Sequence, residues 1–251
     1  TGMLARAMFR LLKRHALVRN LFAAETLGSV TTLVLDKTGT LTRGEMSVVE
    51  LFALSNSARE RGYQLMALAS AAEIVRTKGN ELRDELHGSP TDRALLTAAF
   101  GAGQQSNYHS RQRQILREIP FRSTHKFRAV IISDGPGATR LIIIGAPETL
   151  LTQTTKCLHD RPTACTAQNR KALETCLLTA TRRRRRAVAI AERPATADDL
   201  TLPAEGLLSN LTIVGIALLE DPLRDNAAET IARAREAGRR PIILSGDHPE
   251  T

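Results

Sequence analysis

The chemistry in this sequence centres on the run LVLDKTGTLT at residues 33–42, where an apolar, strand-like segment ends at Asp36. A carboxylate at a strand end can cap the following turn, bind a metal ion, or attack a phosphorus centre as a nucleophile. The residues that follow favour phosphate chemistry, because Lys37 is cationic, Thr38 offers a hydroxyl, and Gly39 lets backbone N–H groups approach an anion. A phosphoryl group on Asp36 would need such donors, and Mg²⁺ to screen its charge.

The elements that must position Asp36 indicate an α/β fold. Apolar, β-branched runs at 30–36, 211–220 and 241–245 are typical of strands buried on both faces. A helix is expected at 225–238, with Gly238 as its C-terminal cap. Both ends of the sequence thus place an acidic loop at the carboxyl end of a buried strand, which is where open parallel sheets bind ligands.

The middle of the sequence favours a mixed α+β domain, because DGPGA at 134–138 predicts a hairpin between two apolar runs. The simplest architecture is one α/β domain interrupted after its first strand by an inserted α+β domain with an antiparallel sheet. The elements expected there are strands at 45–54, 114–121, 126–133, 139–145 and 186–191, helices at 57–75, 90–100 and 166–185, and a polar loop at 76–89.

Composition narrows the classes of partner. The 251 residues are 42% hydrophobic but only 3% aromatic, and the net charge is +9. Positive charge favours a nucleotide, nucleic acid or an anionic membrane surface, while the scarcity of aromatic side chains argues against single-stranded nucleic acid. No apolar run is long enough to cross a bilayer, and both ends look cut from something longer. The three cysteines, Cys157, Cys165 and Cys176, are expected to be reduced thiols.

The run DKTGTLT matches, in all seven positions, the phosphorylation motif of P-type ATPases, the ion pumps that pass through an aspartyl-phosphate intermediate. The resemblance implies that Asp36 is the phosphorylated nucleophile, assisted by Lys37, and that Thr38 contacts the phosphoryl group. It also implies ATP as the phosphoryl donor and Mg²⁺ as the cofactor, with Asp36 and the Thr38 carbonyl as metal ligands. EDPLRD and LSGD resemble two later family segments, which implies that further residues lie near the phosphoryl group: Asp221, Arg224, Ser245, Gly246 and Asp247.

The resemblance extends through the middle of the chain. SPTDRALL, IPFRSTHKFRAVI, IGAPETLL and RRAVAIA look like the elements of the family's nucleotide-binding domain, in the family's order. The nucleotide-binding residues implied are Thr91, Asp92, Phe121, Lys126, Gly145, Ala146 and Arg186. Phe121 would stack on adenine, Lys126 would lie beside the nucleotide, and Arg186 would contact phosphate.

Simpler roles remain open for these residues. Phe121 could be a core residue, Lys126 a surface charge, and Thr91 with Asp92 a helix N-cap. The arginines at 182–185 could form the end of a helix, where positive charge suits the helix dipole.

Three positions depart from the family pattern, and a fourth departs from the pattern of a related superfamily. Ile144 stands where the family has a lysine, which should lower ATP affinity unless a neighbour compensates. Leu223 replaces a proline, and Ser245 replaces a threonine while keeping the hydroxyl. Phosphatases of the haloacid-dehalogenase superfamily carry a second Asp two residues after the nucleophile. Thr38 is there instead, so an acyl phosphate should persist.

The resemblance implies a division of the chain into a stalk-helix end at 1–19, a haloacid-dehalogenase-like phosphorylation domain at 20–44 and 215–251, and a nucleotide-binding domain at 45–214. The branch resembled is that of the calcium, sodium/potassium, proton and magnesium pumps. The expected protein acts at the cytoplasmic face of a membrane with actuator and transmembrane domains, and this segment alone should be crippled as an ATPase. It should not bind the transported cation or nucleic acid. The alternatives are an ATP-binding module without turnover and a haloacid-dehalogenase-type phosphatase.

Overall fold

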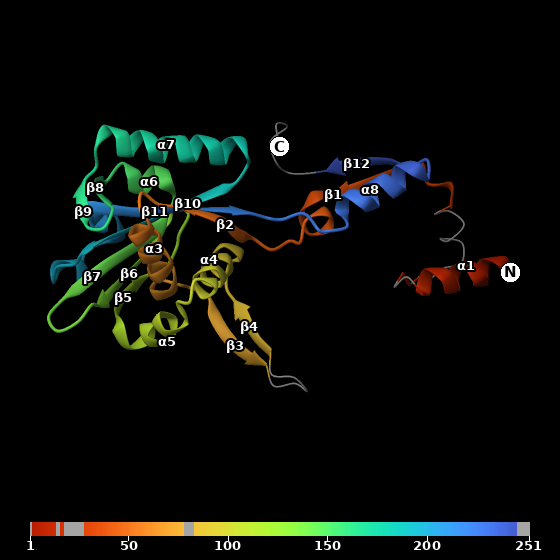
Figure 1. Ribbon diagram of the computed structural model, residues 1–251. Coiled ribbons are helices and arrows are strands. Elements are labelled where there is room, and N and C mark those ends of the chain that lie inside the picture. The colour runs from red at the N-terminus through yellow and green to blue at the C-terminus, as the bar shows by residue number, and fades with distance from the viewer. Residues whose placement is uncertain (1, 14–15, 18–27, 78–82, 245–251) are drawn as a thin grey trace. The chain divides into compact units, whose positions relative to one another are not determined.

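The computed structural model describes residues 2–13, 16–17, 28–77 and 83–244. The chain forms two compact units, one of Thr1–Gly44 with Leu223–Thr251 and one of Glu45–Pro222 (Figure 1). The division between 214 and 215 that the sequence suggested falls inside one strand, β11, so the larger unit continues to the end of that strand.

The larger unit is built on an eight-stranded sheet with the order β5-β6-β7-β10-β11-β8-β9, and β2 also pairs with β11. Its pairs are antiparallel except for β8 beside β11, which are parallel. The strands are β2 Ser47–Phe52, β5 Ile115–Ile119, β6 Phe127–Ser133, β7 Thr139–Gly145, β8 Thr154–Leu158, β9 Pro162–Ala164, β10 Arg186–Pro194 and β11 Leu211–Glu220.

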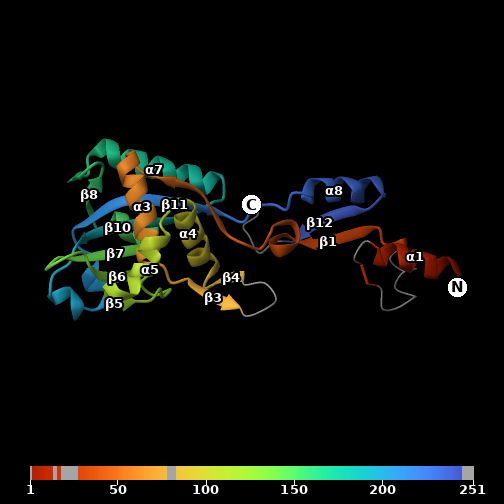
Figure 2. The same ribbon diagram turned by 60° about the horizontal axis from the view of Figure 1, so that its bottom comes forward.

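Helices cover both faces of this sheet (Figure 2). The helices on one face are α3 Asn56–Leu68, α4 Pro90–Gly101 and α5 Gln105–Gln114, and those on the other are α6 Pro147–Leu151 and α7 Ala167–Arg182. A separate hairpin of β3 Glu73–Thr77 and β4 Arg83–His87 lies between α3 and α4 in the sequence.

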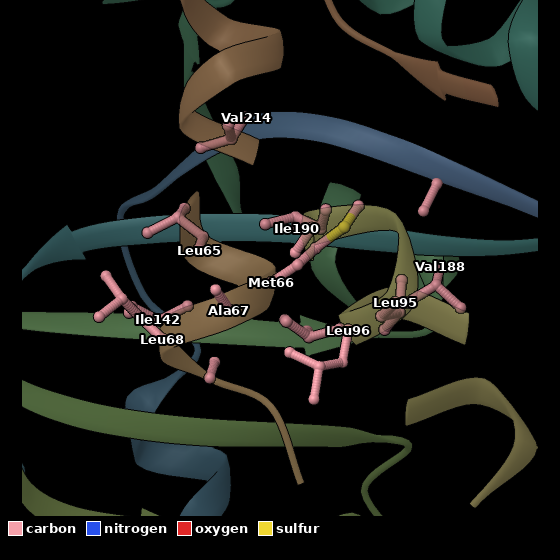
Figure 3. Close-up of a cluster of buried hydrophobic side chains, with 14 of the residues drawn as sticks. Leu65, Met66, Ala67, Leu68, Leu95, Leu96, Ile142, Val188, Ile190 and Val214 are labelled. Atoms are coloured by element: carbon pink, nitrogen blue, oxygen red, sulfur yellow. The ribbon is translucent and has the colours of Figure 1, made fainter. Parts of the chain in front are cut away.

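The two helical layers explain why the central strands are apolar along their whole length. Successive side chains of a strand point to opposite faces. In β6, Val130 and Ile132 pack with α3 and α4, whereas Ala129 and Ile131 join the cluster under α6 and α7. Figure 3 shows the first cluster, in which Leu65 and Met66 of α3 and Leu95 and Leu96 of α4 meet strand residues such as Ile142, Ile190 and Val214.

The smaller unit contains a two-stranded parallel sheet. Its elements are α1 Gly2–Leu12, β1 Thr32–Asp36, α8 Ala227–Glu236 and β12 Arg240–Leu244. Gly238 has φ of 71° and closes α8, as the sequence predicted. The strands are not buried on both faces, however, since Val34 is 58% exposed and Ile243 is 55% exposed. The expectation of burial is therefore wrong for the described residues of β1 and β12, because the elements described in this unit leave these side chains uncovered.

Several polar elements differ from the sequence-based expectation. The polar loop expected at 76–89 contains strand β4, and the helix expected at 57–75 ends at Leu68. Helices α5 and α6 and the β8–β9 hairpin were not predicted. Cys157 and Cys165 pair as a disulfide across that hairpin, and only Cys176 is a free, buried thiol, so the expectation of three reduced thiols is wrong. Among the described helices, none has the length and apolar character that a bilayer crossing requires.

Candidate functional site

Asp36 is the last residue of β1, and the chain turns sharply after it. Thr38 has φ and ψ of −77° and 124°, and Gly39 has 76° and −14°. These are the angles of a type II turn, whose third residue must tolerate positive φ and is therefore usually glycine. The sequence KTG thus dictates a reversal directly beyond the carboxylate, and it leaves Asp36 exposed at the strand end.

Thr42 holds this turn together. Its backbone N–H donates to the Lys37 carbonyl at 3.1 Å, and its Oγ1 accepts the Gly39 N–H at 3.0 Å. The sequence suggested that backbone N–H groups at Gly39 would face an anion. In the structure, the Gly39 N–H instead donates to Thr42 within the loop. Sequence reasoning did not identify Thr42 as the acceptor that fixes the turn.

Arg224 braces the same loop from the start of the α8 segment. Its Nη2 donates to the Gly39 carbonyl at 2.9 Å, its Nε donates to the Thr42 carbonyl at 3.1 Å, and its backbone N–H donates to Leu41 at 2.8 Å. These contacts satisfy loop carbonyls and give Arg224 a positioning role in this structure. The neighbouring pair Arg43–Asp225, at 2.8 Å, is exposed.

For the remaining residues of the phosphoryl site, the sequence-based assignment stays a prediction. Ser245, Gly246 and Asp247 lie outside the described residues, and Asp221 belongs to the larger unit. In the described ranges, no group of three or more His, Cys, Asp or Glu side chains is arranged to hold a metal ion. Among the described residues near β1, the oxygen atoms suited to coordinate a metal ion are therefore those of the Asp36 carboxylate and the turn carbonyls.

The larger unit contains a cavity of about 530 Å³ on the sheet face that carries α3 and α4. This volume lies in the range of small-molecule sites. Six of the seven residues predicted to bind nucleotide line it, although they lie up to 95 positions apart (186 − 91) in the sequence: Thr91, Asp92, Phe121, Gly145, Ala146 and Arg186. Most of the other lining residues are apolar, including Met66, Leu95, Ile144 and Val188.

The N-terminus of α4 forms one wall of the cavity. Ser89, not Thr91, is the N-cap, since its Oγ accepts the Asp92 N–H at 3.1 Å. Thr91 is therefore available to another partner, and its Oγ1 accepts a hydrogen bond from Nη1 of Arg186 at 3.1 Å. This contact joins the start of α4 to the start of β10 at the rim. The run of arginines is divided: α7 ends at Arg182, Arg185 pairs with Glu220 at 3.0 Å, and only Arg186 reaches the cavity.

Phe121 lines the cavity with 60% of its surface exposed, so it is not a core residue. The core phenylalanine is Phe127, which is fully buried. Lys126 is not among the lining residues, and its Nζ lies 3.6 Å from Glu148 Oε1. Its φ of 60° is unusual for a residue with a side chain, and its carbonyl accepts the Ala146 N–H at 2.9 Å.

Gly145 makes that approach possible. A Cβ at this position would lie 2.4 Å from the Cβ of Phe127 and 2.7 Å from the Lys126 carbonyl oxygen. The glycine is therefore required so that β7 can pass close to the start of β6 at the cavity wall.

Sequence reasoning missed Arg128, a buried cation on the cavity wall. Burial lowers the pKa of its guanidinium, and the neighbouring Glu118 carboxylate opposes that shift. The residue lies in an apolar strand, where only its register opposite Ile144 reveals that it faces the cavity.

Comparison with known proteins identifies the family. The family profile described as "P-type ATPase, cytoplasmic domain N" matches residues 60–226, which include the cavity and its lining strands. The chain belongs to the P-type cation-transporting ATPases. The resemblance carried by DKTGTLT is thereby confirmed at the level of the family.

Named relatives match nearly the whole chain. The chain is 29% identical to a calcium-transporting ATPase of Bacillus subtilis, with 96% of this chain and 30% of that protein covered. It is 31% identical to calcium-transporting ATPase 9, plasma membrane-type, of Arabidopsis thaliana, with 99% and 25% covered, and 31% identical to a probable cation-transporting ATPase I of Mycobacterium tuberculosis, with 96% and 15% covered. The chain thus spans less than a third of the length of these relatives.

Proposed function

We propose that this chain is the ATP-binding and phosphorylated segment of an ATP-driven cation pump. The observation that carries the proposal is that six residues implied by the family resemblance line one cavity of nucleotide size. The γ-phosphoryl group of ATP passes to the Asp36 carboxylate, and the resulting acyl phosphate is coupled to ion movement in the complete pump. The smaller unit is then part of a haloacid-dehalogenase-like phosphorylation domain.

The cavity residues divide between the two ends of the nucleotide. The exposed ring of Phe121 offers a stacking surface for the base, which is worth about 1–3 kcal/mol. Arg186, held by Thr91 at the rim, offers a guanidinium to the phosphates. Lys126 lies outside the cavity wall, so it acts on the nucleotide only after leaving Glu148.

At the phosphoryl site, the Asp36 carboxylate is the nucleophile, and Lys37 and the Thr38 hydroxyl stabilise charge on the transferred group. Arg224 and Thr42 keep the turn in the conformation that presents Asp36. Asp36 and the Thr38 carbonyl suit Mg²⁺, which prefers oxygen ligands and commonly takes only one or two carboxylates alongside phosphate oxygens. Mg²⁺ supplies charge neutralisation on the phosphates. Asp221, Ser245, Gly246 and Asp247 complete the proposed site.

Thr38 favours a pump over a haloacid-dehalogenase phosphatase. A carboxylate two residues after the nucleophile would activate water against the acyl phosphate, whereas a threonine hydroxyl is a far weaker base. An aspartyl phosphate on this chain should therefore persist, as an ion pump requires. An ATP-binding module without turnover is the remaining alternative, and we expect the isolated 251-residue chain to behave in that way.

We further propose that the complete pump works at the cytoplasmic face of a membrane with actuator and transmembrane domains, and that its transported cation binds outside this chain. A nucleic-acid role is not proposed, because the exposed apolar and cationic groups at the cavity suit a mononucleotide.

Two measurements test the proposal. Titration of the 251-residue chain with MgATP, followed by NMR, should shift the signals of Phe121, Gly145 and Ala146, and no shift at these residues would remove the nucleotide site. In membranes that carry the complete pump, radiolabelled ATP should label Asp36 with an acid-stable, hydroxylamine-labile phosphate. Asp36→Asn should abolish the label, and Asp225→Asn, a change to an exposed carboxylate in the same unit, should retain it.

A further inference from the structure

Helix α7 ends in three consecutive exposed arginines. Arg182 is the last helical residue, Arg183 is the cap, and Arg184 follows the cap. Among the described residues, no carboxylate pairs with these guanidinium groups and no hydrogen bond engages them. The helix dipole favours cations near its last turn, but Arg184 lies beyond the cap with φ of 58°, a conformation that suits glycine better. The fold itself therefore gives little reason for the full run of charge.

The same run leads directly to the nucleotide cavity. Arg186, two residues after Arg184, lines the cavity, and its Nη1 donates to Thr91 Oγ1 at 3.1 Å. Because consecutive Cα atoms are about 3.8 Å apart, the Cα atoms of Arg182 and Arg184 lie within about 15 Å and about 8 Å of that of Arg186. Charges interact over a Debye length, which is about 10 Å at 0.1 M salt and longer at lower salt. The three charges can therefore act at the mouth of the cavity.

The other charges around this mouth nearly cancel. The cavity wall, with the carboxylate that pairs with one of its arginines, has two cations and two anions: Arg128, Arg186, Asp92 and Glu118. Arg185 adds no surplus, because its guanidinium is shared by the carboxylates of Glu220, at 3.0 Å, and Glu50, at 3.5 Å. Among these groups and the run, the surplus of positive charge comes from the run alone.

We propose that the arginine run Arg182–Arg184 steers anionic nucleotide to the cavity and so speeds the association of MgATP, without contacting the bound nucleotide. Opposite charge around a cleft raises association rates by concentrating the ligand near the site, and the effect falls steeply as ionic strength rises. MgATP carries a net negative charge, whereas adenosine carries none. The inference rests on the proposed nucleotide site and concerns the rate at which that site is filled.

NMR line-shape analysis of the 251-residue chain, followed at Gly145 and Ala146 during titration, gives the rate constants of association and dissociation. In about 0.02 M salt, the variant Arg182→Gln/Arg183→Gln/Arg184→Gln should bind MgATP roughly three- to tenfold more slowly than the wild type. The difference should vanish at about 0.5 M salt, where the Debye length is only a few ångströms. The dissociation rate constant should change less than about twofold, and adenosine should associate equally fast with both proteins.

A second triple variant removes the same amount of charge from the other end of α7. Lys156→Gln/Arg161→Gln/Lys171→Gln changes three exposed cations of the β8–β9 hairpin and the first half of α7. Figure 1 shows this hairpin at the end of α7 that lies away from the start of β10. Lys171 precedes Arg182 by 11 residues (182 − 171), which is about 16 Å along a helix. This variant should slow MgATP association by less than about twofold in low salt, and both variants should match the wild type by circular dichroism.

The outcomes are distinguishable. Equal slowing at low and high salt, equal slowing for adenosine, or a change confined to dissociation would overturn steering by the run while leaving the nucleotide site intact. An effect of the same size in the Lys156, Arg161 and Lys171 variant would assign the slowing to net charge alone, and would also overturn the proposal. A wild type that binds neither MgATP nor adenosine would overturn the proposed function itself.

Discussion

Apolar strands are buried in the larger unit but partly exposed in the smaller one. In the larger unit, Ile131 of β6 and Ile143 of β7 are 1% and 0% exposed, because helices cover both faces of the sheet. In the smaller unit, Val34 of β1 and Ile243 of β12 are 58% and 55% exposed, although their strands are equally apolar. An apolar run therefore predicts a strand, but the burial of that strand depends on the helices and strands that pack against it.

Arginine side chains donate to backbone carbonyls in both units, but the ion pairs differ in burial: the carboxylates of Asp225 and Glu229 in the smaller unit are exposed. In the smaller unit, Arg224 and Arg239 donate to backbone carbonyls at the two ends of β1. In the larger unit, Arg193 and Arg61 are paired with buried carboxylates.

The largest effect is expected at Gly145, where the packing of the larger unit leaves no space for a side chain. Gly145→Ala should cost about 3 kcal/mol of unfolding free energy, because the new Cβ meets backbone and Phe127 rather than a flexible side-chain end. Urea unfolding measures the loss. Gly101→Ala is the matched control, since a Cβ there meets nothing within 4 Å and should be neutral or stabilising. Equal effects of the two changes would contradict the close approach of β7 to β6.

The second prediction concerns acid stability of the larger unit. Hydrogen bonds from Arg193 lower the pKa of Asp199 from 3.8 to about 2, against the opposing effect of burial. Because the folded pKa is the lower one, the stabilisation is complete above about pH 4 and is lost as the pH falls toward 2. The loss should be about 2 kcal/mol. The wild type should lose this stabilisation as the pH falls from 5 to about 2, and Asp199→Asn, which has no carboxylate there, should not. If the stability of the variant falls with pH as steeply as that of the wild type, the Arg193–Asp199 pair is not the source of the pH dependence.

Sequence patterns predicted the apolar elements of both units far better than the polar ones. Strand β11 was expected at 211–220 and is found at those residues, and the hairpin of β6 and β7 has the expected turn. The β3–β4 hairpin was missed because its residues are mostly polar or charged. Arg128 was missed because its place in the cavity depends on register with Ile144, and register is a tertiary property.

The third prediction is an effect confined to the smaller unit. Arg224→Ala removes two hydrogen bonds to the loop after Asp36 and should destabilise that loop by about 1 kcal/mol, since the contacts are largely exposed. Amide hydrogen exchange at Thr42, whose N–H is held within the turn, should accelerate roughly fivefold. Exchange in β6 and β7 should not change. Arg43→Ala, which removes only an exposed ion pair with Asp225, should have a smaller effect, and a matching loss in that variant would show that the bracing is not specific to Arg224.

The smallest expected change in stability concerns the C-terminal ends of one helix in each unit. Helices α7 and α8 end in the same way. Just beyond each helix, a backbone N–H donates to the carbonyl five residues earlier: Arg185 to Ala180 in α7, and Arg239 to Ala234 in α8. The residue with positive φ is Gly238 in α8 but Arg184, at 58°, in α7. Glycine adopts this conformation without the steric cost that a Cβ incurs, although it also adds freedom to the unfolded chain. Arg184→Gly should therefore stabilise the larger unit by about 0.5 kcal/mol and raise its Tm by about 1–2 °C. Arg183→Gly, at a cap with ordinary negative φ, should not stabilise. If Arg184→Gly lowers the Tm, the arginine side chain contributes more there than its backbone strain costs.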